Sequence, residues 1–144
     1  MVRLCATNYF VLPLPLYYYY NHTDSSSHTF SSRRLDMSIA YDTYISLTKK
    51  YGFYERYQAE IDFIYWNGCF FLPLFNSASM NQFHTIDELN TIFANARNNL
   101  SNISNNPYFI KSFSNLKILG DLIYTTVSND TYNDIRELFY LLTH

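Results

Sequence analysis

The chain has 144 residues, which suits one domain and is too short for two ordinary ones. With 48% apolar, 19% aromatic and 15% charged residues, it has the side chains for a core and lacks the composition of a disordered protein. A formal net charge of −2 and the lack of a basic stripe disfavour nucleic acid as the main partner, because phosphate neutralisation dominates such binding. Three glycines in the whole chain argue against a glycine-rich phosphate loop.

The amino-acid composition and the hydropathy of the chain indicate the kind of genome that encodes it and the compartment in which it is expected. Residue types with AT-rich codons, above all Tyr, Asn, Phe and Ile, far outnumber Gly, Ala, Arg and Pro. The bias indicates an AT-rich genome, such as that of many viruses and mobile elements. No stretch has the roughly 20 apolar residues that a transmembrane segment needs. We therefore expect a soluble, cytoplasmic, aromatic-rich protein whose two cysteines, Cys5 and Cys69, are free thiols.

The first 34 residues lack a regular pattern. Leucine and proline alternate from Leu12 to Leu16, and this run cannot be a helix because each proline fixes φ and has no N–H. A polar, serine-rich stretch follows, and regular periodicity begins near Asp36. We therefore expect residues 1–34 to be an atypical extended or flexible N-terminal arm and residues 35–144 to form a single domain.

A helix is predicted over about residues 37–51, directly after the candidate N-cap Asp36. Lysines occupy its last turn, where positive charge suits the helix dipole, and Gly52 follows as the natural stop. Its stripe recurs in steps of four and three residues and consists of Met37, Tyr41, Tyr44, Thr48 and Tyr51.

The segment around Asn67 and Gly68 is predicted to be an antiparallel β-hairpin, with strands at about 57–66 and 69–75. Aromatic and β-branched residues flank the Asn-Gly pair on both sides. This dipeptide is typical of a type I′ turn, which requires positive φ at both of its positions. The strand pairing is expected to fail or bulge near Pro73, which has no N–H to donate.

Helical patterns return in the second half of the chain. Thr85 and Glu88 have the spacing of a capping box, which predicts a helix over about 86–100. Residues 108–127 are ambiguous, because a further helix suits part of 108–123 and Leu122–Val127 also suits a strand. A clear helix is predicted at about 131–143. The expected fold class is therefore α+β, a small single domain in which the hairpin is packed by three or four helices.

Residues that could carry chemistry each have a simpler structural explanation. Cys69 and His84 could form a thiolate pair, but Cys69 stands among large apolar residues, and burial raises the pKa of a thiol. Asp62 and Glu60 share one face of the predicted hairpin, without further groups that would indicate a catalytic carboxylate pair. No zinc, dinucleotide or nucleophile motif is present. We therefore predict no catalytic, cofactor-binding or metal-binding residues, and no cofactor.

The part of the hairpin next to its turn is the predicted contact surface. In the type I′ register Ile64, Trp66 and Phe71 project to one side, where either another element of the chain or a partner covers them. Large aromatic residues with few charges are typical of interface cores. We therefore predict that these three residues bind another protein or a second copy of the chain in a homodimer.

The leading functional hypothesis is a non-enzymatic protein-binding module of the inhibitor, immunity or viral and mobile-element effector type. It rests on the small size, the few charges, the lack of catalytic motifs and the aromatic surface. Two alternatives stay open. A nucleic-acid-associated regulatory protein would be favoured by a joined basic patch, and a small enzyme or ligand-binding domain by a deep pocket with converging polar side chains.

Overall fold

The computed structural model describes residues 37–100 and 102–144, and all regular structure in this part of the chain is helical. The predicted α+β class is therefore wrong, because the described residues contain no strand. The predicted arm at residues 1–34 lies outside the described residues. None of the described helices is long and apolar enough to cross a membrane.

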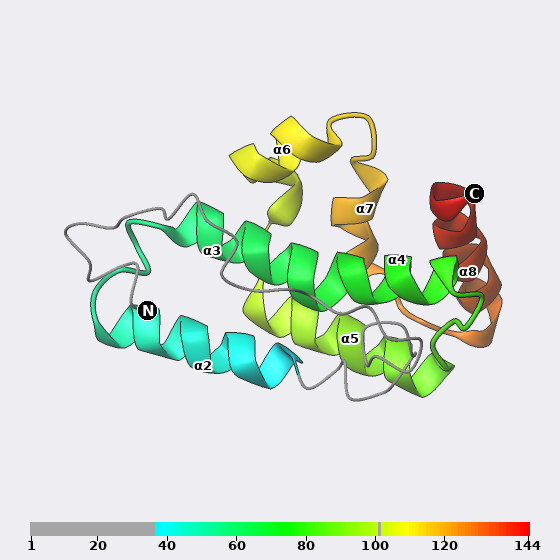
Figure 1. Cartoon of the computed structure of the whole chain (residues 1–144), viewed down its shortest axis with the longest axis horizontal. Coiled ribbons are helices and arrows are strands. Elements are labelled where there is room, and N and C mark those ends of the chain that lie inside the picture. Colours follow the sequence, from blue (N-terminus) through cyan, green and yellow to red (C-terminus); the bar gives the residue numbers. More distant parts are fainter. Residues whose placement is uncertain (1–36, 101) are drawn as a thin grey trace, which may run out of the picture.

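A long central helical stretch organises the fold (Figure 1). α3 (Gln58–Tyr65), the π-helical turn η2 (Trp66–Phe71) and α4 (Leu72–Ser79) follow one another directly. On the buried face of this stretch, a pair of adjacent buried residues recurs every four residues. These pairs are Ile61 with Asp62, Tyr65 with Trp66, Cys69 with Phe70, Pro73 with Leu74, and Ser77 with Ala78. An α-helix has 3.6 residues per turn, so a four-residue repeat drifts around its surface. The π-helical turn has more residues per turn and compensates for part of this drift.

This helical stretch replaces the predicted hairpin, and both strands, at 57–66 and 69–75, are wrong. Asn67 and Gly68 lie inside the π-helical turn, and the glycine with positive φ in the described part of the chain is Gly52. The aromatic and β-branched residues of this segment pack against helices, and tertiary packing of this kind overrides intrinsic β propensity.

The π-helical turn also accommodates Pro73. Inside an α-helix, a proline lacks the N–H that would bond four residues back, and its ring clashes with that carbonyl. Here the amide of Leu72 donates to the carbonyl of Asn67, five residues back, and Pro73 falls in the first turn of α4. A first-turn residue needs no intrahelical N–H bond, so the helix continues through the proline.

Two of the predicted helices pack on the π-helical turn. α2 (Met37–Lys50) and α5 (Ile86–Asn99) both contact η2 and lie below the central stretch in the view of Figure 1. After α2 the chain turns at Gly52, whose φ of 70° confirms the predicted stop. α5 begins with the predicted capping box, in which Thr85 and Glu88 each accept from the other's backbone amide.

The second half of the chain is also helical throughout its described elements, so the strand alternative does not apply. Its short helices are η3 (Ile103–Asn105), α6 (Pro107–Phe113), α7 (Ile118–Asp121) and η4 (Leu122–Tyr124). α6 contacts α3, and η4 contacts α5. The last helix, α8 (Asn129–Thr143), packs on α4 and begins before the predicted residue 131, because Ser128 and Thr131 form its capping box.

Trp66 is the centre of the core and joins the central stretch to α6. Its ring stacks on Phe71 at 5.3 Å between centroids and meets Phe109 and Phe113 edge to face at 4.9 and 5.0 Å. Aromatic pairs of this kind contribute about 0.5–1.5 kcal/mol beyond area burial. The buried indole N–H has no hydrogen-bond acceptor among the described residues, a cost that the ring packing offsets.

Gly68 determines how closely α2 approaches the π-helical turn. A Cβ at this position would lie 2.7 Å from the hydroxyl oxygen of Tyr41 in α2. We predict that Gly68→Ala lowers the free energy of unfolding by about 1 kcal/mol, because overpacking costs about 1–3 kcal/mol and the better helix propensity of alanine offsets about 1. Urea denaturation measures the difference.

The matched test is the same substitution in a Tyr41→Phe background, which lacks the oxygen that the new methyl group would meet. There we expect a smaller loss of stability than in the natural chain. An equal loss in both backgrounds would contradict the close approach of Tyr41 to Gly68.

Candidate functional site

The three predicted partner-binding residues do not share one surface. Ile64 is 44% exposed, Phe71 is half-buried and Trp66 is 0% exposed. Because the chain is helical here, positions 64 and 66 fall on different sides instead of the same side of a hairpin. Trp66 is therefore a core residue with no exposed atoms to offer a partner, whereas partner binding by Ile64 and Phe71 stays a prediction.

Ile64 borders an apolar hollow of about 330 Å³, which Ala40, Tyr41 and Tyr44 of α2 also line. The side chains of Ala40 and Ile64 have no polar group that could select an occupant. The hydroxyls of Tyr41 and Tyr44 are the polar side-chain groups of this lining, so the hollow offers mainly apolar contact area.

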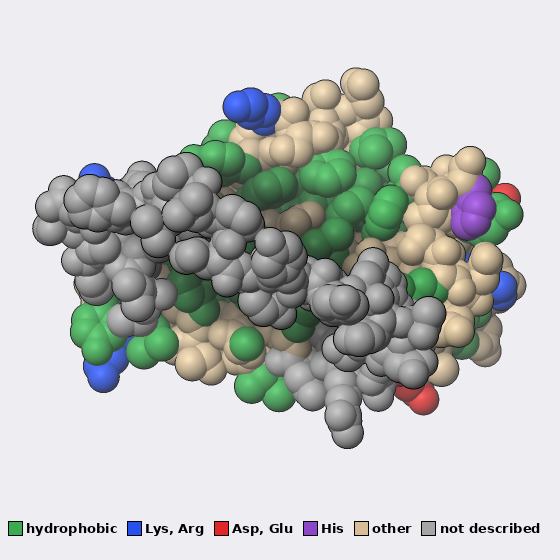
Figure 2. All heavy atoms as spheres, in the orientation of Figure 1, with side chains coloured by type: hydrophobic (Ala, Val, Ile, Leu, Met, Phe, Trp, Pro, Cys, Tyr) green, Lys and Arg blue, Asp and Glu red, His purple; other side chains and the backbone are tan. Residues whose placement is uncertain are grey.

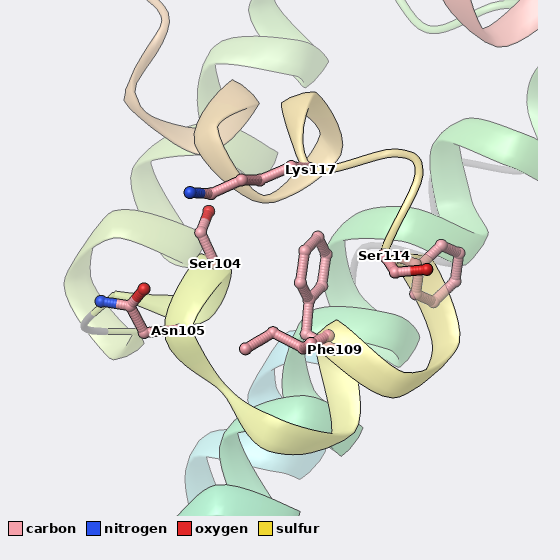
Figure 3. Close-up of a pocket in the computed structure, with 7 residues that line it drawn as sticks. Ser104, Asn105, Phe109, Ser114 and Lys117 are labelled. Atoms are coloured by element: carbon pink, nitrogen blue, oxygen red, sulfur yellow. The ribbon is translucent and has the colours of Figure 1, made fainter.

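A second hollow, which we call the α6 pocket, combines apolar and polar side chains (Figure 3). It measures about 260 Å³ and lies between η3, α6 and the turn into α7. In Figure 3 the Phe109 ring stands in the pocket and the Lys117 side chain runs past it toward Ser104. The lining consists of Ser104, Asn105, Phe109, Ile110, Phe113, Ser114 and Lys117.

The floor of the α6 pocket is formed by Phe109 and Phe113, which lie one turn apart on α6. Their rings stack at 5.6 Å between centroids, and both meet Trp66 edge to face. Phe109 is buried and Phe113 is half-buried. The floor therefore rests directly on the core of the domain, which makes it a preformed apolar surface.

Asn106 attaches the beginning of α6 to the central stretch. Its side-chain oxygen accepts from the amides of Tyr108 and Phe109 at 2.9 and 3.3 Å. Its side-chain nitrogen donates to the carbonyl of Ala59 in α3 at 2.7 Å. An asparagine N-cap stabilises a helix by about 1 kcal/mol, and this one also fixes where α6 stands on α3.

The other wall of the α6 pocket depends on the close approach of α7. Ser104 donates to the carboxylate of Asp121, at the end of α7. A Cβ on Gly120 would lie 2.6 Å from the Ser104 hydroxyl oxygen and 2.9 Å from the Phe109 ring. The missing side chain of Gly120 therefore lets α7 close the pocket on this side.

Asp62 is a buried carboxylate at a separate hollow of about 350 Å³ between α3 and the residues before α6. The hydroxyl of Tyr54 donates to Asp62 Oδ1 at 3.0 Å. Burial raises the pKa of Asp62, while hydrogen bonds from Tyr54 and Gln58 and the charge of Lys49 lower it. Burial and the Asp62 charge in turn raise the pKa of Tyr54 to about 12. This carboxylate is held by donors of its own chain, which is typical of a structural buried acid.

The surroundings of Cys69 and His84 suit a structural role for each residue. Burial raises the pKa of Cys69 to about 12, so its side chain is an uncharged thiol at neutral pH. His84 is fully buried, with Nε2 3.3 Å from the carbonyl oxygen of Pro73 and Nδ1 3.6 Å from the Glu88 carboxylate. The imidazole thus connects α4 with the first turn of α5.

Basic residues near the corner between α2 and α3 lie over tyrosine rings. The pairs are Lys49 over Tyr54, Lys50 over Tyr51, and Arg56 over Tyr57, with cations 4.6 to 5.7 Å from the ring centroids. Cation–π contacts at exposed sites contribute about 0.5–1 kcal/mol each. One face of each ring is therefore covered by a cation of this chain, which reduces the surface on which a nucleic-acid base could stack.

The residues of the α6 pocket did not stand out in the sequence because the segment 108–127 is ambiguous between helix and strand. Two signals locate α6. Asn106 and Pro107 are an N-cap residue followed by a proline at the first helical position. Phe109 and Phe113 have the four-residue spacing of side chains on one face of a helix.

Asp62 makes a testable contribution to the pH dependence of stability. Its pKa in the folded chain is above the ordinary value of about 3.9, so its contribution is fully present below that value and is lost as pH rises through the raised pKa. Asp62→Asn cannot ionise and keeps an acceptor for Tyr54. We predict that the stability of Asp62→Asn relative to the natural chain increases with pH across this window.

Urea denaturation at a series of pH values from 3.5 to 7 measures this difference. Tyr54→Phe serves as the companion variant, because it removes a hydrogen bond that lowers the Asp62 pKa and should move the window to higher pH. A stability difference between Asp62→Asn and the natural chain that stays constant with pH would show that Asp62 is not destabilised by burial.

Comparison with known proteins identifies no relative. No protein-family model matches the chain, and neither a curated protein nor a solved structure matches it significantly. The function of the chain must therefore be inferred from its own sequence and structure.

Proposed function

We propose that this chain is a non-enzymatic protein-binding module that receives a side chain of its partner in the α6 pocket. The observation that carries the proposal is the construction of that pocket. It has an aromatic floor and the half-exposed Ile110 at its side, and the exposed Asn105, Ser114 and Lys117 form its rim. An apolar centre inside a polar rim is the usual anatomy of a protein–protein interface.

The volume of the pocket suits one large side chain. Sites for small molecules and cofactors commonly measure about 300–1,000 Å³, and a cavity of about 150 Å³ holds a benzene ring. The α6 pocket, at about 260 Å³, lies between these sizes. Burying a leucine or phenylalanine side chain there would contribute about 1.5–3 kcal/mol to association.

The polar groups of the pocket suit recognition. The Ser114 hydroxyl, the Asn105 amide and the Lys117 ammonium can hydrogen-bond to the backbone or side chains of a docked segment. The buried acid Asp62 and the buried thiol Cys69 lie outside the described lining of this pocket. This separation supports binding rather than chemistry as the role of the pocket.

The surface next to the pocket is apolar as well. Figure 2 shows hydrophobic side chains gathered between the central stretch and the short helices α6 and α7. Phe71 and Phe75 are half-buried, and Phe71 lies 5.2 Å from the floor residue Phe113 and 5.4 Å from Phe75, between ring centroids. A partner seated in the α6 pocket could therefore extend its contact along this band. The band includes Phe71, one of the residues predicted from the sequence to bind a partner.

A single charged substitution tests the proposal. Proteins captured by the full chain from its native host are identified, and each candidate partner is purified for calorimetry. We predict that Ile110→Asp, at a position that is 49% exposed, weakens binding of the true partner at least tenfold, or about 1.4 kcal/mol, because it places a charge in the pocket.

The matched control is Leu141→Asp on α8, where the side chain is 69% exposed and lies outside the pocket. It should leave the affinity unchanged. Equal loss with both variants, or no loss with either, would mean that the partner does not use the α6 pocket.

A further inference from the structure

We infer that the side chain received by the α6 pocket stands next to an aspartate or glutamate in its partner, so that the pocket selects an acidic and apolar segment of another protein. This inference rests on the proposed function of the pocket and adds the chemistry of its occupant. It follows from the charge at the rim, from the lack of an ion pair to that charge in the described part of the chain and from the apolar floor.

Lys117 provides the charge of the pocket. It is the one ionisable side chain among the described residues that line the pocket, and no ion pair in the described part of the chain includes it. Its side chain runs along the pocket past Phe109 (Figure 3). The ammonium group ends near Ser104 at the side of the pocket, with no carboxylate of the described residues in ion-pair contact.

Two carboxylates close to α6 accept hydrogen bonds from uncharged hydroxyl groups. The segment 102–120, which contains the whole pocket, includes two lysines and no acidic residue. Asp121 accepts the hydroxyl hydrogen bond of Ser104, and Glu60 accepts that of Tyr108 at 2.6 Å. Both carboxylates keep their charge, but neither forms an ion pair with Lys117 among the described residues, so a carboxylate of a partner can still pair with the ammonium at the rim.

Shape and charge together define the occupant. A bulky apolar side chain fills the space above Phe109 and Phe113, and a carboxylate one or two residues away in the same segment meets Lys117 at the exposed rim. A lysine or arginine at that place in the partner would be repelled. Charge complementarity of this kind fixes register and rejects wrong partners.

Selection from a phage-displayed library of random 12-residue peptides against the full chain tests the inference. Peptides that also bind Ile110→Asp are removed, so that the remaining ones depend on the pocket. We expect these to combine a bulky apolar residue with Asp or Glu within two positions, more often than the unselected library does. Against Lys117→Glu, we expect Lys or Arg at those flanking positions instead.

The matched control is Lys111→Glu, which changes an exposed lysine of α6 that is outside the pocket lining. It should still select acidic flanks. For one synthetic peptide from the first selection, Lys117→Gln should weaken binding about fivefold, the upper range for an exposed charge pair, and Lys111→Gln by less than about twofold.

The two proposals fail in different ways. Pocket-dependent apolar peptides without acidic flanks, or an acidic preference that survives Lys117→Glu, would overturn this inference and leave the protein-binding function standing. No enrichment of pocket-dependent apolar peptides would overturn the inference as well, and the calorimetry of Ile110→Asp then decides the proposed function separately.

Discussion

The π-helical turn at Trp66–Phe71 is the constraint on which the other elements depend. In a regular α-helix a four-residue repeat rotates by about 40° with each step, so a buried face of five such pairs would wind away from its neighbours. The wide turn reduces this rotation in the middle of the stretch and admits Pro73 directly after it. As a result one central helix packs on α2 and α5 at its middle, on α6 at its start and on α8 at its end.

Polar side chains fix several helix ends in the described part of the chain. Thr85, Asn106 and Ser128 cap α5, α6 and α8, and the Arg97 guanidinium donates to the carbonyl oxygens of Ile123 at 3.0 Å and of Thr125. Such bonds position helices, whereas the packing of aromatic and aliphatic side chains fills the core between them. The described helices are thus fixed by caps and shape, and no network of ion pairs is seen in this part of the chain.

Three helices could be predicted from the sequence because each combines a stripe of three- and four-residue steps with a terminal signal, as α5 does with Thr85 and Glu88. The hairpin prediction failed because the residues around Asn67 and Gly68 have high β propensity. Their side chains can also be assigned alternately to the two faces of a strand. The pairs of buried residues recur every four residues, which indicates a helix. This spacing is longer than the 3.6 residues of an α-helical turn, so it is recognisable as helical only once the π-helical turn is known. The α6 pocket depends on contacts between segments far apart in sequence, such as Asn106 with Ala59, which no local pattern contains.

The position of Trp66 has an optical consequence. It is the single tryptophan of the chain, and its indole lies buried against both floor rings of the α6 pocket. Indole emission depends on the polarity of its surroundings, so the tryptophan fluorescence of this protein, excited where its tyrosines do not absorb, originates at one known place and reports whether α6 is seated on the central stretch. The natural chain thus contains its own spectroscopic probe directly beneath the pocket, without any added label.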